Sequence, residues 1–131
     1  MVSELPPSSK ALFAVAIVYG KDRNPAEKIA DFLNQTALAE GIEADLVAFS
    51  SQGSLEVMQD ASVVIAVDDL AYKELVDEFP GWQTKLYTTR QFIERAGESF
   101  PQNNNFRHIM ECIYGIFKIK IKIQRYDSDE V

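Results

Sequence analysis

The sequence predicts an α/β protein with a three-layer, open, doubly wound parallel sheet of about four strands in the order 2-1-3-4. The apolar runs "ALFAVAIV" at 11–18 and "SVVIAV" at 62–67 are typical of strands covered on both faces, as parallel sheets require. Segments with helical periodicity alternate with the strand-like segments, and right-handed crossovers between them produce the doubly wound order. A chain of 131 residues is expected to form one domain.

The segment after the first strand predicts a helix and then a second strand. Asn24 suits a helix cap, Pro25 suits the first helical position, and Glu27 completes a capping-box pattern. Gly41 supplies the left-handed residue that ends this helix. "IEADLVAF" at 42–49 follows as the second strand, so the first half of the chain forms a βαβ unit.

The second half of the domain repeats the alternation with shorter elements. Asp68 or Asp69 is expected to cap the helix after the third strand, and Thr88 with Gln91 is expected to cap a later short helix. The predicted elements are a helix at 54–60, a strand at 62–67, a helix ending at Pro80, a strand at 84–88, a helix ending at Gly97 and a final helix from about 104 to 114.

The two ends of the chain are predicted to lie outside the main α/β domain at 11–115. Residues 1–10 form a flexible lead-in and residues 126–131 an acidic tail. Between them, "IFKIKIKIQR" at 116–125 alternates Ile and Lys with period two, which predicts an amphipathic C-terminal strand.

This strand is an expected interaction surface. Its apolar face and its unpaired backbone suit addition to a sheet edge of a second copy or of another protein. Packing on its own domain with a solvated lysine face is the open alternative. The residues concerned are Ile119, Ile121 and Ile123 on one face and Lys118, Lys120 and Lys122 on the other.

A candidate anion site lies in the loop after the first strand. In sheets of this kind ligands bind beyond the carboxyl ends of the strands where the strand order reverses, here after strands one and three. A helix N-terminus at that point offers backbone N–H groups to a phosphate or sulfate. A helix cap with a solvated charged turn explains the same residues without a ligand. The candidates are Gly20, Lys21, Arg23, Asn24 and Asp68.

From strand one to the final helix, the order of segments resembles the low-molecular-weight protein tyrosine phosphatase family, including its arsenate-reductase relatives. "RNPAEKIADFL" is similar to the family's RSPxAE and first helix, and "ASVVIAVDD" is similar to its ADxVIxMD strand. "EFPGWQTKLYTTRQF" resembles the stretch that follows, and "ESFPQNNNFRHIMECI" stands where the family has its Asp-Pro loop and last helix. The resemblance spans about 90 residues and implies the same fold.

The chain departs from this family at both catalytic positions. The family's nucleophile is the Cys of CxxxxxR, and aligned on Arg23 this chain has "IVYGKDR", without Cys. The family's general acid is the Asp of Asp-Pro, and the corresponding place is Phe100-Pro101, which cannot protonate a leaving oxygen. The resemblance implies a phosphate-binding role for Arg23 alone.

We therefore predict a non-catalytic, phosphatase-like binding or regulatory module that could retain an anion pocket. The alternative is a flavodoxin-like enzyme or cofactor carrier that binds FMN or a nucleotide at the loop after strand one. Against that alternative, "GKDRN" lacks the Ser and Thr hydroxyls of an FMN phosphate loop.

Composition narrows the other function classes. The net charge of -7 argues against general nucleic-acid binding, and no apolar run is long enough to cross a membrane, so a cytoplasmic protein is expected. No cofactor is predicted. Cys112 is expected to be a buried thiol on the last helix and His108 a surface residue of it. A Mg²⁺ site at Asp22, Asp68 and Asp69, as in receiver domains, is a further alternative. Receiver domains carry adjacent acids at the end of strand one, whereas this chain has Tyr19-Gly20 there.

Overall fold

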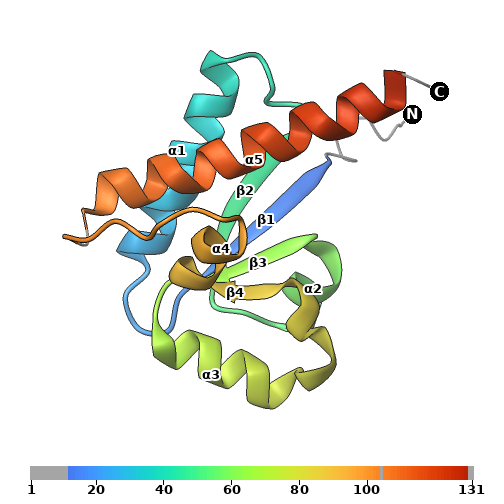
Figure 1. The fold of residues 1–131 in the computed structure, drawn as a ribbon. Coiled ribbons are helices and arrows are strands. Elements are labelled where there is room, and N and C mark those ends of the chain that lie inside the picture. The colour runs from blue at the N-terminus through green and yellow to red at the C-terminus, as the bar shows by residue number, and fades with distance from the viewer. Residues whose placement is uncertain (1–11, 104, 130–131) are drawn as a thin grey trace.

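The computed structural model describes residues 12–103 and 105–129 and contains one four-stranded sheet (Figure 1). The predicted lead-in at 1–10 lies outside the described residues. All pairings are parallel and the strand order is β2-β1-β3-β4, which confirms the predicted fold. The strands are β1 (Phe13–Val18), β2 (Leu46–Ser51), β3 (Val63–Ala66) and β4 (Leu86–Thr88).

Helices cover both faces of the sheet and complete the three layers. α1, α4 and α5 pack on one face, and α2, α3 and η2 pack on the other (Figure 1). None of the described helices is both long enough and apolar enough to span a membrane. The helices are α1 (Asn24–Ala39), α2 (Leu55–Asp60), α3 (Asp69–Glu78), the 3-10 helix η2 (Pro80–Lys85), α4 (Thr89–Arg95) and α5 (Phe106–Asp129).

Side-chain alternation along β1 explains why its sequence is continuously apolar. Val15 and Ile17 belong to the core shared with α1 and α5, whereas Ala16 and Val18 belong to the core shared with α2 and α3. Successive residues of a strand point to opposite faces, so a central strand buried on both sides needs apolar residues at every position. β1 is therefore the centre of the fold and fixes where its carboxyl end lies.

Side chains bond to the backbone at the β2 edge of the sheet and just before β3. At the β2 edge, the Asn34 amide of α1 donates to the Ala48 carbonyl at 2.8 Å and accepts from the Ala48 N–H at 2.9 Å. Near the β4 edge, Lys85 Nζ donates to the Ala61 carbonyl at 2.6 Å. Burial lowers the pKa of Lys85, opposed by the charge of Asp60. The two Asn34 contacts limit the unpaired backbone that the edge strand β2 exposes.

The helix ends follow the sequence signals except at the start of α1 and at the end of α5, which runs past the predicted end at 114. Thr88 and Gln91 form the predicted capping box of α4, and Gly41 has the predicted positive φ of 78°. The capping box expected at Asn24 and Glu27 is absent, because Asn24 is the first helical residue and Arg23 stands at the cap without a side-chain bond. The expectation failed because the helix begins one residue earlier than the pattern indicated.

The prediction of a C-terminal strand at 116–125 is wrong, because α5 continues through this segment to Asp129. The predicted tail at 126–131 therefore begins inside the helix, and residues 130 and 131 lie outside the described residues. The lysine and isoleucine alternation does not form two strand faces. Ile121 is 2% exposed in the core, whereas Ile119 is 57% and Ile123 is 55% exposed on the outer side of the helix.

Tertiary packing is the reason that a helix forms where the sequence has a strand-like pattern. Ile113, Phe117 and Ile121 recur every four residues and bury one stripe of α5 against the sheet. Phe117 contacts the rings of Phe13 and Phe92, whose centroids lie at 5.4 and 4.9 Å. This burial outweighs the roughly 1 kcal/mol that Gly115 costs inside a helix.

Candidate functional site

The carboxyl ends of β1 and β3 are joined by a carboxylate. Asp68 follows β3 and caps α3, where its Oδ1 accepts from the Ala71 N–H at 2.7 Å. Its other oxygen, Oδ2, accepts from the Gly20 N–H at 3.1 Å. The predicted capping role of Asp68 is thus confirmed, and the same side chain ties the loop after β1 to the start of α3.

Gly20 allows this contact because it has no side chain. A Cβ built on Gly20 would lie 3.0 Å from Asp68 Oδ1 and 3.3 Å from Leu70 Cδ2. Any larger residue would push the carboxylate away from the loop. The glycine after β1 therefore serves the close approach of an internal carboxylate in this structure.

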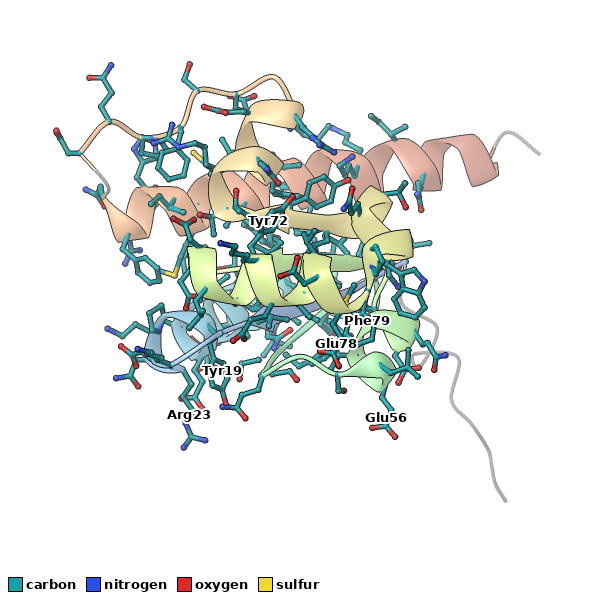
Figure 2. All side chains as sticks on the ribbon, turned by 90° about the horizontal axis from the view of Figure 1, so that it is seen from below. Tyr19, Arg23, Glu56, Tyr72, Glu78 and Phe79 are labelled. Carbon is teal, nitrogen blue, oxygen red and sulfur yellow. The ribbon has the colours of Figure 1, made fainter. Side chains whose placement is uncertain are left out.

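The other predicted anion-binding residues do not converge on Gly20. Arg23 Nε pairs with Glu27 Oε2 at 3.2 Å, and the Arg23 side chain points away from the sheet (Figure 2). The Asn24 N–H donates to Asp22 Oδ1 at 3.0 Å, and Lys21 is exposed. Of the five residues predicted for this site, the structure brings Gly20 and Asp68 into contact.

Internal carboxylates already accept from the backbone donors of this loop. The Gly20 N–H is bonded to Asp68 and the Asn24 N–H is bonded to Asp22. Each carboxylate also places negative charge where an incoming anion would sit, and like charges at short range repel. An external oxyanion would have to displace these carboxylates before it could use the same N–H groups.

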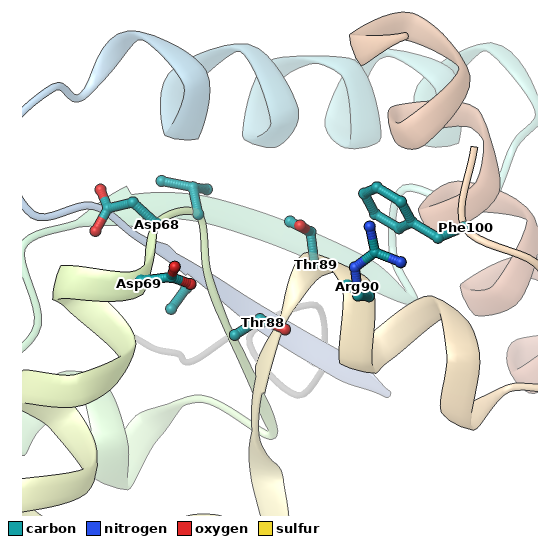
Figure 3. Close-up of a pocket in the computed structure, with 8 residues that line it drawn as sticks. Asp68, Asp69, Thr88, Thr89, Arg90 and Phe100 are labelled. Atoms are coloured by element: carbon teal, nitrogen blue, oxygen red, sulfur yellow. The ribbon is translucent and has the colours of Figure 1, made fainter. Parts of the chain in front are cut away.

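A polar pocket of about 270 Å³ opens beside Asp68, at the carboxyl ends of β3 and β4 (Figure 3). Arg90 stands in its wall with the guanidinium carbon 4.3 Å from the centre of the Phe100 ring and with Nη1 3.3 Å from Glu94 Oε2. The lining residues are Ala66, Val67, Asp68, Asp69, Thr88, Thr89, Arg90 and Phe100.

Thr89 and Arg90 were not among the site residues predicted from the sequence. They directly follow β4, the neighbour of β3 in the sheet. Polar residues at the carboxyl end of the adjacent parallel strand were the signal that could have found them.

Phe100, which stands where the family resemblance would set the general acid, lies in this same pocket. Phe100 lines the pocket and Pro101 is buried. The Arg90 guanidinium stacks on the Phe100 ring, and this ring has no proton that it could donate to a leaving group. Asp68 and Asp69, which follow β3, line the pocket on the side opposite Phe100 (Figure 3).

Cys112 and His108 lie on α5. Burial raises the pKa of the Cys112 thiol, and the neighbouring carboxylates of Glu98 and Glu111 raise it further. A thiol with a raised pKa is a poor nucleophile at neutral pH because little of it is thiolate. The exposed His108 follows Asn105, whose side chain accepts from the His108 backbone N–H at 3.1 Å.

The carboxylates near the carboxyl ends of β1 and β3 do not assemble into a metal-binding cluster. In the part of the chain that the structure describes, no three His, Cys, Asp or Glu side chains come together in a way that could hold a metal ion. Asp22 and Asp68 instead bond to the backbone N–H groups of Asn24 and of Gly20 with Ala71. This arrangement does not favour the Mg²⁺ alternative.

The fold is that of the low-molecular-weight protein tyrosine phosphatases. The YwlE arginine phosphatase from Geobacillus stearothermophilus is similar, with a TM-score of 0.59 at 14% sequence identity, over 91% of this chain and 97% of that one. A low-molecular-weight phosphotyrosine phosphatase from Vibrio cholerae O395 has a TM-score of 0.59 at 11% identity, over 86% and 97% of the two chains.

A third similar structure is the low-molecular-weight protein tyrosine phosphatase from T. tengcongensis, with a TM-score of 0.59 at 15% identity over 84% of this chain and 98% of that one. No protein-family model matches the sequence, and no match was found among curated proteins. At these identities the likeness establishes the fold and leaves the activity to be argued from the residues. It does not favour the flavodoxin-like alternative.

Proposed function

We propose that this protein is a non-catalytic binding or regulatory module built on the phosphatase fold. The observation that carries the proposal is the contact between Asp68 Oδ2 and the Gly20 N–H at 3.1 Å. It closes the loop after β1 on an internal carboxylate, in the place where the family resemblance implies a phosphate.

The described residues place neither a cysteine in the loop after β1 nor an aspartate before Pro101, the two positions that the family resemblance assigns to catalytic groups. Alignment on Arg23 sets Ile17 at the family's Cys position, and Ile17 is fully buried inside β1. Cys112, the single cysteine of the sequence, lies on α5 and has a raised pKa. A phosphate ester would meet neither a thiolate nor, at Phe100, a proton donor.

The anion pocket takes a modified form in this proposal. The Asp68 carboxylate already accepts from the Gly20 N–H, so phosphate or sulfate binds only weakly there. The ion pair between Arg23 and Glu27 has the same effect, since the guanidinium already has a carboxylate partner at 3.2 Å.

Protein association is assigned to α5 in place of the predicted strand. Lys118 Nζ pairs with Glu40 Oε1 at 3.0 Å and Ile121 is buried, so these two residues hold α5 in place. Ile119, Ile123, Lys120 and Lys122 are exposed and stay candidates for contact with another protein. In this proposal the module therefore binds other proteins through an exposed surface of α5.

Turnover of p-nitrophenyl phosphate and of a phosphotyrosine peptide tests the proposal. We expect no hydrolysis above the uncatalysed rate from the full chain, and the same result from Arg23→Ala and Cys112→Ser. Hydrolysis by the full chain that disappears in either variant would show a working catalytic site and would overturn the proposal. A known active low-molecular-weight phosphatase assayed in parallel verifies the conditions.

A further inference from the structure

The outer side of the second half of α5 carries an uncovered apolar stripe. Ile116, Ile119 and Ile123 are separated by three and four residues, so they lie on one side of the helix. Ile116 is buried at the inner edge of this side, whereas Ile119 and Ile123 are uncovered. Ile119 is 57% and Ile123 is 55% exposed, among the largest exposures of big apolar side chains in the described residues. Together with Lys120 and Lys122 we call this set the α5 surface.

The stripe has a hollow at its inner edge. A groove of about 210 Å³ lies between the end of α4 and α5, lined by Ala96 and Glu98 on one side and by Ile116, Ile119, Lys120 and Ile123 on the other. A groove of this size accommodates an apolar side chain of a partner. The α5 surface therefore combines projecting isoleucines with a recess, as helix packing requires.

The preceding part of the same stripe is already covered. Cys112 lies four residues before Ile116 and is half-buried, with the charge of Glu98 close enough to raise its pKa. Phe100 and the buried Pro101 belong to the loop that packs beside the first half of α5 (Figure 1). The spacing of four, three and four from Cys112 to Ile123 is that of a coiled-coil seam.

Lysines flank the uncovered part on both sides. Lys120 and Lys122 are exposed and form no ion pair with any residue that the structure describes, in contrast to Lys118 and its bridge to Glu40. In coiled-coil terms they stand at the positions beside the seam, where charge selects the partner. A second copy of α5 would bring lysines against lysines, so these flanks favour an acidic partner.

We propose that the α5 surface binds an amphipathic helix of a partner protein whose apolar stripe is flanked by Asp and Glu. The isoleucines and the groove bind the apolar stripe, and Lys120 and Lys122 pair with the acidic flanks. The proposal rests on the proposed function, because it names the kind of partner that the non-catalytic module binds.

A membrane surface is the other class of partner that an Ile and Lys helix face suggests. The α5 surface offers only two strongly exposed apolar side chains for insertion, which is a small area for holding a helix at a membrane. A helix with acidic flanks could pair with both lysines and also fill the groove with its apolar side chains. Lipid binding is therefore an outcome that would contradict the proposal.

Binding of two designed fluorescent peptides to the full chain tests the proposal. Both peptides are amphipathic helices of about three heptads with the same leucine seam, one with Glu and one with Lys at the flanking positions. We expect the Glu-flanked peptide to bind at least about tenfold more tightly by fluorescence anisotropy. Its affinity should fall as NaCl is raised from about 0.05 to about 0.5 M, since salt screens exposed charges.

Four variants separate the α5 surface from general effects. Ile119→Ser with Ile123→Ser should abolish binding, whereas Leu55→Ser, at a 50% exposed leucine of α2, should leave it unchanged. Lys120→Glu with Lys122→Glu should reverse the preference, so that the Lys-flanked peptide binds more tightly. Lys28→Glu on α1 with Lys73→Glu on α3, at two exposed lysines, makes the same change of net charge and should preserve the original preference.

Three results would overturn the proposal. They are equal or undetectable binding of the two peptides, a dimer by sedimentation that Ile119→Ser with Ile123→Ser dissociates, and binding to phosphatidylcholine and phosphatidylserine vesicles that the same double variant abolishes. Circular dichroism of each variant checks that α5 is intact. Hydrolysis of p-nitrophenyl phosphate is measured separately, so failure of the proposed function is distinguishable from failure of this one.

Discussion

Replacing Ile121 by alanine measures how much the second half of α5 contributes to the core. Ile121 is 2% exposed and belongs to the cluster that includes Ile113 and Phe117. The substitution removes three carbon atoms, worth about 0.8 kcal/mol each on burial, and leaves a cavity that adds to the cost. We expect a loss of about 3 kcal/mol in the free energy of unfolding.

The same substitution at Ile119 is the matched control. Ile119 is 57% exposed two residues away, so Ile119→Ala is expected to cost less than about 1 kcal/mol. In urea denaturation followed by circular dichroism, a loss of about 3 kcal/mol lowers the midpoint by about 1.5 M if the m-value is about 2 kcal/mol/M. If the alanine variant fails to fold, Ile121→Val can be measured instead, with an expected loss of about 1 kcal/mol in the free energy of unfolding.

Equal losses at the two positions would refute the reasoning. A strand would set Ile119 and Ile121 on the same face, with the same burial, because side chains two residues apart in a strand point the same way. A helix sets them on different sides, and only this geometry makes their energetic costs differ several-fold.

Two further predictions concern α5. Gly115 lies inside the helix with nothing within 4 Å of an added Cβ, so Gly115→Ala should raise the free energy of unfolding by about 0.5–1 kcal/mol, whereas Gly97→Ala, at a φ of 88°, should lower it by about 1 kcal/mol in the same denaturation assay. A loss in Gly115→Ala would contradict a continuous helix. Burial and the hydrogen bond to Glu40 Oε1 at 2.9 Å raise the pKa of Tyr114. The folded state therefore holds this proton while the unfolded state releases it above about pH 10, so stability falls as the pH rises past that value. Tyr114→Phe should show a smaller fall in thermal scans from about pH 9 to pH 11, and an unchanged slope would exclude Tyr114 as a source.

The central sheet could be predicted from the sequence because its strands are buried on both faces. Only apolar residues fit at every position of β1 and β3, and this requirement leaves a pattern that no amphipathic helix imitates. Short caps were predictable for the same local reason, since Thr88 and Gln91 bond to each other's backbone within one turn. The cap predicted at Asn24 is absent because α1 begins one residue earlier, so Asn24 is already the first helical residue.

The C-terminal helix could not be predicted from periodicity alone. Alternating Ile and Lys at 118–123 matches a strand, but on a helix it divides the isoleucines between an inner side at Ile121 and an outer side at Ile119 and Ile123. The alternation does not indicate which of these isoleucines is buried. That depends on the tertiary arrangement of α5 over the sheet, which no local pattern contains.

The candidate site was predictable in position but not in chemistry. The ends of β1 and β3 meet as the strand order requires, which brings Gly20 and Asp68 together. The direction of the Asp68 carboxylate toward the Gly20 N–H depends on the cap of α3 and on the missing side chain of Gly20. These contacts join residues 48 positions apart and leave no signal in the sequence.

Closure of the loop after β1 by Asp68 is tested most directly by the amide signal of Gly20 during a titration with inorganic phosphate. In the full chain we predict no change of the Gly20 amide resonance at millimolar phosphate, because Asp68 holds its N–H. In Asp68→Ala, which frees this donor and removes the negative charge, the resonance should shift and saturate, and in Asp68→Asn, which keeps an acceptor, it should respond less. A saturable shift of Gly20 in the unmodified chain, as large as that in Asp68→Ala, would contradict the account.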